Sequence, residues 1–151
     1  MSQELVIEGG CHCHAIRYAL HWPVSEGSET SPVIPARRCG CSYCTRIDGV
    51  WTSHPRARLV VRHDSNDELI KYRFATGTAD FLVCSRCGIT ALVTCDMDEQ
   101  RYAVVNVNTF DDPEGRFTLE LSDSNFDGEG VDDRLERRKA RWINTVEWEQ
   151  R

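Results

Sequence analysis

The chain has 151 residues, of which 40% are hydrophobic and 28% are charged, and its formal net charge is -6. This length and composition predict one domain with a real core, over residues 1–151, and the negative charge argues against a nucleic-acid-binding protein because phosphate recognition needs surplus Lys and Arg. The first residues lack a basic region followed by an apolar run, and no stretch approaches ~18 consecutive apolar residues, which predicts a cytoplasmic protein without a membrane span.

Short runs of alternating apolar and polar residues dominate the middle of the chain. Such runs predict half-buried antiparallel strands, because successive side chains of a strand point to opposite faces. In chain order they are Ala15 to His21, Arg58 to Arg62, Leu69 to Phe74, Phe81 to Cys84, Thr90 to Thr94, Tyr102 to Val107 and Phe117 to Leu121. Turn-forming residues separate some of them, at 65–67, 76–77 and 111–115. The protein is therefore expected to be mainly β.

Two segments depart from this alternation. Ser25 to Pro35 is small, polar and proline-containing, which predicts an exposed loop. From Val131 the alternation ends, and Asp132 or Asp133 is a suitable N-cap for a short C-terminal helix that carries Leu135 and Trp142 near one face. The Arg and Lys residues late in this helix suit the negative end of its dipole.

Seven of the eight cysteines fall into three tight clusters. These are Cys11-His-Cys13, Cys39-Gly-Cys41-Ser-Tyr-Cys44 and Cys84-Ser-Arg-Cys87-Gly88. Spacings of one or two residues let neighbouring sulfurs reach one metal ion, and zinc favours such thiolate donors. Thiols stay reduced in the cytosol, so these clusters indicate metal ligands rather than disulfides. Seven sulfurs suit two zinc ions.

The clusters divide unequally between the two ions. Cys84 and Cys87 resemble a zinc knuckle in which Gly88 allows a positive φ angle behind the second ligand. Cys11 and Cys13 form the complementary pair, and a closed site of four thiolates is structural. Three cysteines remain for the second ion: Cys39, Cys41 and Cys44. Three ligands leave a fourth position open, as in catalytic zinc sites, unless Cys95 or a histidine completes a second closed site.

Several other side chains are weaker candidates. Arg46 and His54 follow the three-cysteine cluster, and both are possible substrate contacts; a guanidinium such as that of Arg46 binds a carboxylate in bidentate fashion. Cys95 is otherwise expected to be a small buried thiol.

Further residues are open to two interpretations. His12 and His14 are either metal ligands or surface residues. Tyr43, Trp51 and Phe110 are either pocket walls or core residues. Arg37 and Arg38 are expected to be solvated, although their positive charge would favour the thiolate form of Cys39.

The ordered series of cysteine motifs resembles the glutathione-dependent formaldehyde-activating enzyme (GFA) family, which includes centromere protein V. The matching stretches are residues 10–13 and 15–18, 39–44 with Arg46 and Gly49, 69–74, 84–88 and 108–113. The core of the domain is therefore expected at about residues 5–115, with an acidic extension over 116–151. The resemblance implies a β-tent fold of antiparallel sheets. It also implies a structural zinc on Cys11, Cys13, Cys84 and Cys87, and a catalytic zinc on Cys39, Cys41 and Cys44.

The resemblance further implies an activity. In the family's named reaction the thiol of glutathione adds to formaldehyde to give S-(hydroxymethyl)glutathione, which is a carbon–sulfur lyase reaction run in reverse. The expected substrate is therefore a small-molecule thiol or thiol adduct such as glutathione. The alternative is a non-catalytic, zinc-stabilised interaction module of the centromere protein V type, because the acidic extension resembles that branch. Redox sensing by Cys84 and Cys87 is disfavoured, since no thioredoxin-like βαβ context surrounds them.

Overall fold

The computed structural model describes residues 4–24, 31–64, 69–111 and 116–150. These residues are mainly in β-strands, as predicted, and their two α-helices are α1 (Cys44–Ile47) and α2 (Val131–Arg141). The strands are β1 (Glu4–Gly10), β2 (Ile16–Pro23), β3 (Val33–Cys39), β4 (Val50–Thr52), β5 (Arg58–His63), β6 (Leu69–Tyr72), β7 (Asp80–Cys84), β8 (Thr90–Met97), β9 (Gln100–Asn106), β10 (Thr118–Ser124) and β11 (Thr145–Gln150).

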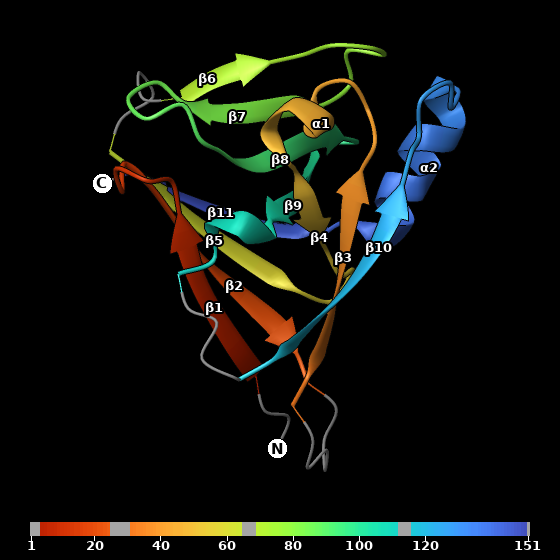
Figure 1. Ribbon diagram of the computed structural model, residues 1–151. Coiled ribbons are helices and arrows are strands. Elements are labelled where there is room, and N and C mark those ends of the chain that lie inside the picture. Colours follow the sequence, from red (N-terminus) through yellow and green to blue (C-terminus); the bar gives the residue numbers. More distant parts are fainter. Residues whose placement is uncertain (1–3, 25–30, 65–68, 112–115, 151) are drawn as a thin grey trace.

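The strands form two sheets (Figure 1). One has the order β1-β2-β5-β11, and the other has the order β10-β3-β4-β9-β8-β7-β6. Most neighbours are antiparallel, but β10 pairs with β3 and β11 pairs with β5 in parallel. Both parallel pairs arise because the last third of the chain returns to add an edge strand to each sheet.

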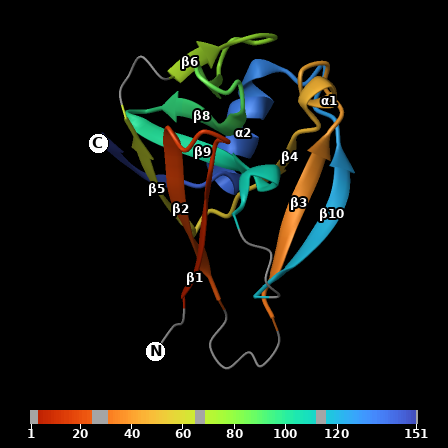
Figure 2. The ribbon, with the colours of Figure 1, turned by 60° about the vertical axis from the view of Figure 1, so that its left-hand side comes forward.

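The core lies between the two sheets (Figure 2). Alternation along β2 places Ile16, Tyr18 and Leu20 inside, each at most 3% exposed. Leu92 of β8 and Val105 of β9 belong to the same buried cluster from the larger sheet. The period of two in the sequence therefore predicted both the strands and their buried faces here.

Four strands were not expected from the sequence: β1, β3, β4 and β11. The interpretation of Ser25 to Pro35 as an exposed loop is wrong at its end, because β3 begins at Val33 and buries Ile34 completely. Pro35 is tolerated in β3, where its carbonyl oxygen accepts a hydrogen bond from Thr52 Oγ1 at 2.7 Å. The expected turn at 76–77 is present, with Gly77 at φ +67°, whereas residues 25–30, 65–67 and 112–115 lie outside the described residues.

Strand β6 is correctly predicted, but its apolar residues are not buried. Ile70 is 51% exposed and Tyr72 is 46% exposed, because β6 is the last strand of its sheet. Phe74 follows the strand and packs against Phe81, with ring centroids 4.8 Å apart.

The C-terminal helix is also correctly predicted, although its cap differs. Gly130 is the N-cap, and Asp132 and Asp133 lie in the first turn, where their charges still favour the helix dipole. Residues of α2 and Arg37 of β3 line one cavity. In the part of the chain that the structure describes, no helix is long and apolar enough to cross a membrane.

Candidate metal centres

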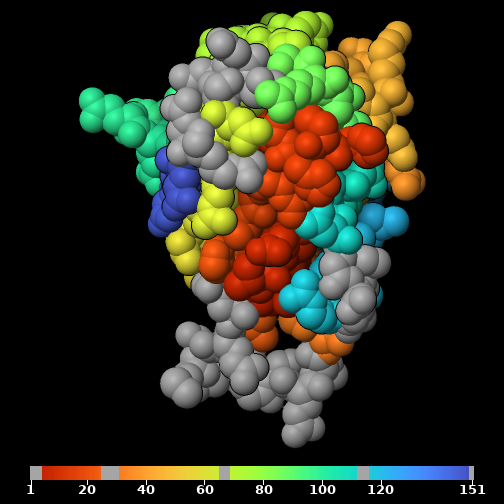
Figure 3. Space-filling model, turned by 90° about the vertical axis from the view of Figure 1, so that its left-hand side faces the viewer, coloured from red at the N-terminus to blue at the C-terminus, as the bar shows by residue number. Residues whose placement is uncertain are grey.

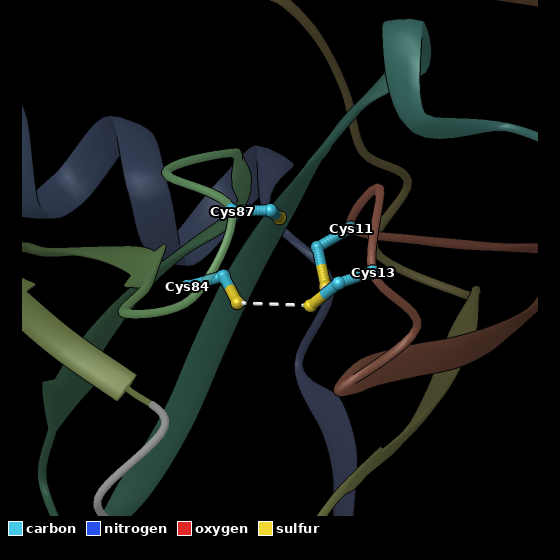
Figure 4. Close-up of side chains that lie close together, drawn as sticks. All are labelled: Cys11, Cys13, Cys84 and Cys87. Atoms are coloured by element: carbon cyan, nitrogen blue, oxygen red, sulfur yellow. Dashed lines mark hydrogen bonds between the residues drawn. The ribbon is translucent and has the colours of Figure 1, made fainter.

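The first cysteine cluster joins the two sheets. Cys11 and Cys13 lie between β1 and β2, while Cys84 ends β7 and Cys87 lies in the following turn. The four sulfurs are all within 4.8 Å of one another, and Cys13 Sγ is 3.7 Å from Cys11 Sγ and 3.5 Å from Cys84 Sγ (Figure 4). Four sulfurs arranged tetrahedrally about a zinc ion at ~2.3 Å would be about 3.8 Å apart. The four cysteines thus meet as the sequence pattern predicted, in an arrangement that suits one metal ion.

The local backbone conformation places the sulfurs of both cysteine pairs close to one another. The chain turns sharply after Cys11, whose Sγ accepts a hydrogen bond from the backbone N–H of Ile16 at 3.3 Å. On the other side Cys84 Sγ accepts one from Arg86 N–H at 3.4 Å, and Gly88 has the positive φ angle expected from the sequence, +78°. Backbone N–H groups that point at sulfur stabilise the thiolate form that a metal requires.

The contact between the two segments that carry these cysteines is also visible on the molecular surface. In Figure 3 the red residues of the N-terminal strand and its following turn lie against the green residues of the β7 region. Cys13 and Cys84 are 71 positions apart in the chain, so a metal here would connect segments distant in sequence.

The second cluster is local. Cys39 ends β3, Cys41 lies in the next loop and Cys44 begins α1, and their sulfurs are within 4.8 Å of one another. Within the described ranges no other His, Cys, Asp or Glu belongs to this group. Cys95 is elsewhere in the core, 2% exposed, and its Sγ accepts a hydrogen bond from Arg138 Nη1 at 3.4 Å. The structure therefore gives no support to Cys95 as a fourth ligand.

Two donors and one strand contact hold the second cluster in place. Trp51 Nε1 donates to Cys44 Sγ at 3.3 Å, and the Cys44 backbone N–H donates to Cys41 Sγ at 3.4 Å. The loop is also fixed from outside, because Gly40 N–H donates to the carbonyl oxygen of Ser124, the last residue of β10, at 2.7 Å.

The pKa values of the cysteines in the second cluster indicate that its sulfurs cannot all ionise without a bound cation. Hydrogen bonding from Cys44 lowers the pKa of Cys39 to about 6, while the same contact and burial raise the pKa of Cys44. One thiol therefore ionises readily at the expense of its neighbour. Three thiolates this close require a divalent cation to balance their charge, so the donor set fits a soft metal such as zinc.

The first cluster shows the same division. Burial raises the pKa of Cys11 to about 12. Burial also opposes ionisation of Cys87, but hydrogen bonds from the backbone N–H groups of Ile89 and Cys13 outweigh it and lower the pKa of Cys87 to about 6. A bound cation would favour the thiolate at every sulfur of this cluster.

The second cluster opens into a cavity of about 100 Å³. Its walls are partly apolar, with Trp51, Phe74, Phe81 and Trp142 among the lining residues. The remaining wall carries positive charge from β3 and α2, supplied by Arg37, Arg134, Arg137 and Arg138. A molecule in this cavity would contact the three cysteines and the arginines at once.

The two predicted substrate contacts do not line this cavity. Arg46 is exposed at the end of α1, where its Nη1 donates to the carbonyl oxygen of Ser42 at 2.6 Å. His54 lies against Trp22, with ring centroids 5.4 Å apart, and its Nδ1 accepts a hydrogen bond from Arg56 N–H. A role for either residue with substrate remains a prediction without structural support.

The structure also distinguishes among the residues for which the sequence left two interpretations. Trp51 is a cavity wall, Tyr43 stacks with Phe74 and Phe110 packs edge-on against Phe117. His12 and His14 are exposed and do not belong to the first group of ligand atoms.

Sequence reasoning missed the cavity arginines. Arg37 was interpreted as solvated, and the arginines of α2 only as favourable charges near the helix end. The available signal was the spacing of Arg134, Arg137 and Arg138, because residues three and four apart share one helix face.

Comparison with known proteins decides the family. The family model described as "Glutathione-dependent formaldehyde-activating enzyme" matches residues 6–121. The chain belongs to this family. The GFA match includes both cysteine clusters and ends before α2 and β11, so Arg134, Arg137 and Arg138 of the cavity lie outside it. A crystal structure of a Rhodobacter sphaeroides protein is 26% identical, covering 75% of this chain and 99% of that chain, with a TM-score of 0.45.

Proposed function

We propose that the protein is a zinc-dependent enzyme of the carbon–sulfur lyase type, acting on a small-molecule thiol such as glutathione and a small aldehyde or related electrophile. In this proposal zinc is held by Cys39, Cys41 and Cys44. The observation that carries it is the three-cysteine group that lacks a fourth protein donor among the described residues and faces a cavity. Membership of the GFA family supports the reaction class.

The proposed reaction is an addition. A bond forms between the thiol sulfur and the carbonyl carbon, the π electrons of the carbonyl move to oxygen, and oxygen takes up a proton while sulfur loses one. Zinc with three thiolate ligands would supply a position at which a bound thiol loses its proton near neutral pH. The reverse reaction breaks the carbon–sulfur bond and returns thiol and aldehyde.

The residues of the chain have separate roles in this proposal. Trp51 orients Cys44 through its indole N–H, and the aromatic walls formed by Phe74, Phe81 and Trp142 limit the access of water to the reacting atoms. The first cluster, with its four cysteines, is assigned a second zinc ion with a structural role, because four protein ligands leave no position for substrate.

The second candidate function is a non-catalytic interaction module. It is favoured by the exposed face of β10, where Leu119 is 38% exposed and Leu121 is 55% exposed beside acidic Glu120 and Asp123. In that case both metals would be structural, and the second ion would gain a further protein ligand in place of an exchangeable water or thiol.

The test compares Cys44→Ser with Cys95→Ser. Metal analysis of the reduced, purified wild type should find two zinc ions per chain, and Cys44→Ser should retain about one, keep its β-sheet circular dichroism and lose turnover of thiol plus aldehyde. Cys95→Ser removes a buried cysteine outside both groups and should keep both ions. A wild type with one zinc ion, or Cys44→Ser with full turnover, would contradict the proposal.

A further inference from the structure

The arginines that line the cavity carry more positive charge than the protein itself balances. Arg138 of α2 is 6% exposed, and its Nη1 donates to Thr78 Oγ1 at 2.8 Å and to Cys95 Sγ. Its Nε has no hydrogen-bond partner among the residues that the structure describes. Both partners of Nη1 belong to side chains that are not carboxylates, and no carboxylate in the described part of the chain forms an ion pair with this buried guanidinium.

Arg37 of β3 is in a similar position. Among the described residues the one hydrogen bond of its side chain is a long one, from Nη2 to Ser53 Oγ at 3.4 Å. Arg37 is half-buried and lines the same cavity as Arg137 and Arg138. Desolvated like charges that face one cavity are costly unless an anion joins them.

The neighbouring carboxylates account for only part of this charge. Glu129 accepts from Arg137 Nη2 at 2.9 Å and lies 3.8 Å from Arg134 Nε, so two arginines share one carboxylate. Asp127 also lines the cavity, but it forms no ion pair within the described residues. Three thiolates with one divalent ion would carry a single net negative charge. Together with Glu129 and Asp127, this leaves the four guanidinium groups one negative charge short.

We propose that the arginine wall formed by Arg37, Arg134, Arg137 and Arg138 is a binding site for a carboxylate group of the substrate. A guanidinium binds a planar carboxylate through two parallel hydrogen bonds, and Arg37 and Arg138, which form no ion pair with a carboxylate among the described residues, are the groups left to bind it. This inference rests on the proposed function, because the carboxylate would belong to a molecule whose thiol end lies at the Cys39, Cys41 and Cys44 cluster. Since α2 lies outside the residues that the family model matches, the chain would obtain this selectivity from its C-terminal segment.

The test uses two probes that differ only in charge, 3-mercaptopropionate and its neutral amide, 3-mercaptopropionamide. Binding of each to the reduced, zinc-loaded protein is measured by calorimetry. The carboxylate should bind about tenfold more tightly or better, because a charge-assisted bidentate contact is lost in the amide. Arg138→Met and Arg37→Met should each reduce this preference to about twofold or less, with little change in binding of the amide.

Arg62→Met is the matched control, because it removes one positive charge from the other sheet, where Arg62 pairs with Glu149 at 2.8 Å. It should keep the full preference. If Arg138→Met fails to fold, Arg37→Met decides alone. Equal binding of the two probes, no binding of either, or an undiminished preference in the folded arginine variants would overturn the inference.

The same measurements separate this inference from the proposed function. A protein that prefers the carboxylate probe but turns over no thiol with aldehyde would retain the binding site and lose the proposed reaction. A protein that turns over charged and neutral thiols equally well would retain the reaction and lose the binding site.

Discussion

Trp51 illustrates how one side chain tunes the second cluster without being a metal ligand. It is 5% exposed, it lines the cavity, and its indole N–H points at Cys44 Sγ. A hydrogen bond to a metal-bound thiolate fixes the orientation of the ligand and offsets part of its negative charge. The position thus serves both the shape of the cavity and the affinity of the metal site.

Replacing Trp51 by Phe should therefore weaken the second site selectively. Phe keeps most of the apolar wall but removes the N–H donor, and loss of such a supporting contact typically costs about tenfold or more in metal affinity. Competition with a chromophoric chelator should show weaker binding of one zinc ion and unchanged binding of the other.

Trp148→Phe is the control for this experiment. Trp148 lies in β11 of the other sheet, where its ring contacts His63 and Arg101. Both zinc affinities should stay at the wild-type values in this variant. Unchanged affinities in Trp51→Phe as well would mean that the hydrogen bond does not support the metal.

At the scale of elements, the turn after β7 depends on a backbone conformation that few residues adopt. Gly88 follows Cys87 at φ +78°, and a Cβ placed there would meet nothing within 4 Å. Space is therefore not the constraint. The left-handed conformation alone costs an ordinary L-residue roughly 1–2 kcal/mol.

We expect Gly88→Ala to lower the stability of the zinc-loaded protein by about 1–2 kcal/mol, and Gly88→Asn to lower it less, because Asn tolerates the left-handed region. Denaturant unfolding at a fixed zinc concentration measures both. Equal stability of the three proteins would show that the turn relaxes to another conformation.

The elements also show what the sequence could predict. Strands that bury one face, such as β2 with Ile16 and Leu20, can be predicted from the alternation of apolar and polar residues alone. Helix α2 can be predicted because this alternation ends at Val131. Strand β3 was missed because it begins inside the proline-containing segment that was interpreted as a loop. Strand β11 was missed because it joins a sheet edge in parallel through a long connection, and local patterning contains no signal for such a partner. The exposure of Ile70 in β6 has the same origin, since its burial depends on whether another strand or layer covers it.

At the scale of the whole molecule, the cysteine clusters could be predicted from the sequence, but the arginines of the cavity could not. Sequence spacing grouped the cysteines correctly, because thiolate chelation restricts which spacings are useful and leaves few ways to divide seven sulfurs. The arginine wall required the tertiary structure. Arg37 and Arg138 are about a hundred positions apart, and only the return of α2 toward β3 places both on one cavity.

The two clusters should contribute very differently to global stability. The first bridges Cys13 and Cys84, 71 positions apart and on different sheets, whereas the second spans only 39–44. If a metal crosslink restricts the unfolded chain as a disulfide does, the longer closed loop is worth about 4 kcal/mol and the shorter about 2 kcal/mol. The first cluster also fixes how the two sheets meet around the core, so its loss affects packing throughout the molecule.

Metal removal should therefore occur in two distinguishable steps. Titration with a chelator should first release one zinc ion per chain from the cluster that faces the cavity, with loss of turnover and little change in the far-ultraviolet circular dichroism. Release of the second ion should coincide with loss of the β-sheet signal, because the binding energy of a structural zinc is folding energy. In Cys44→Ser only the second step should remain. Unfolding that accompanies the first released ion would contradict this order, since it would mean that the local cluster, rather than the one between the sheets, holds the fold together.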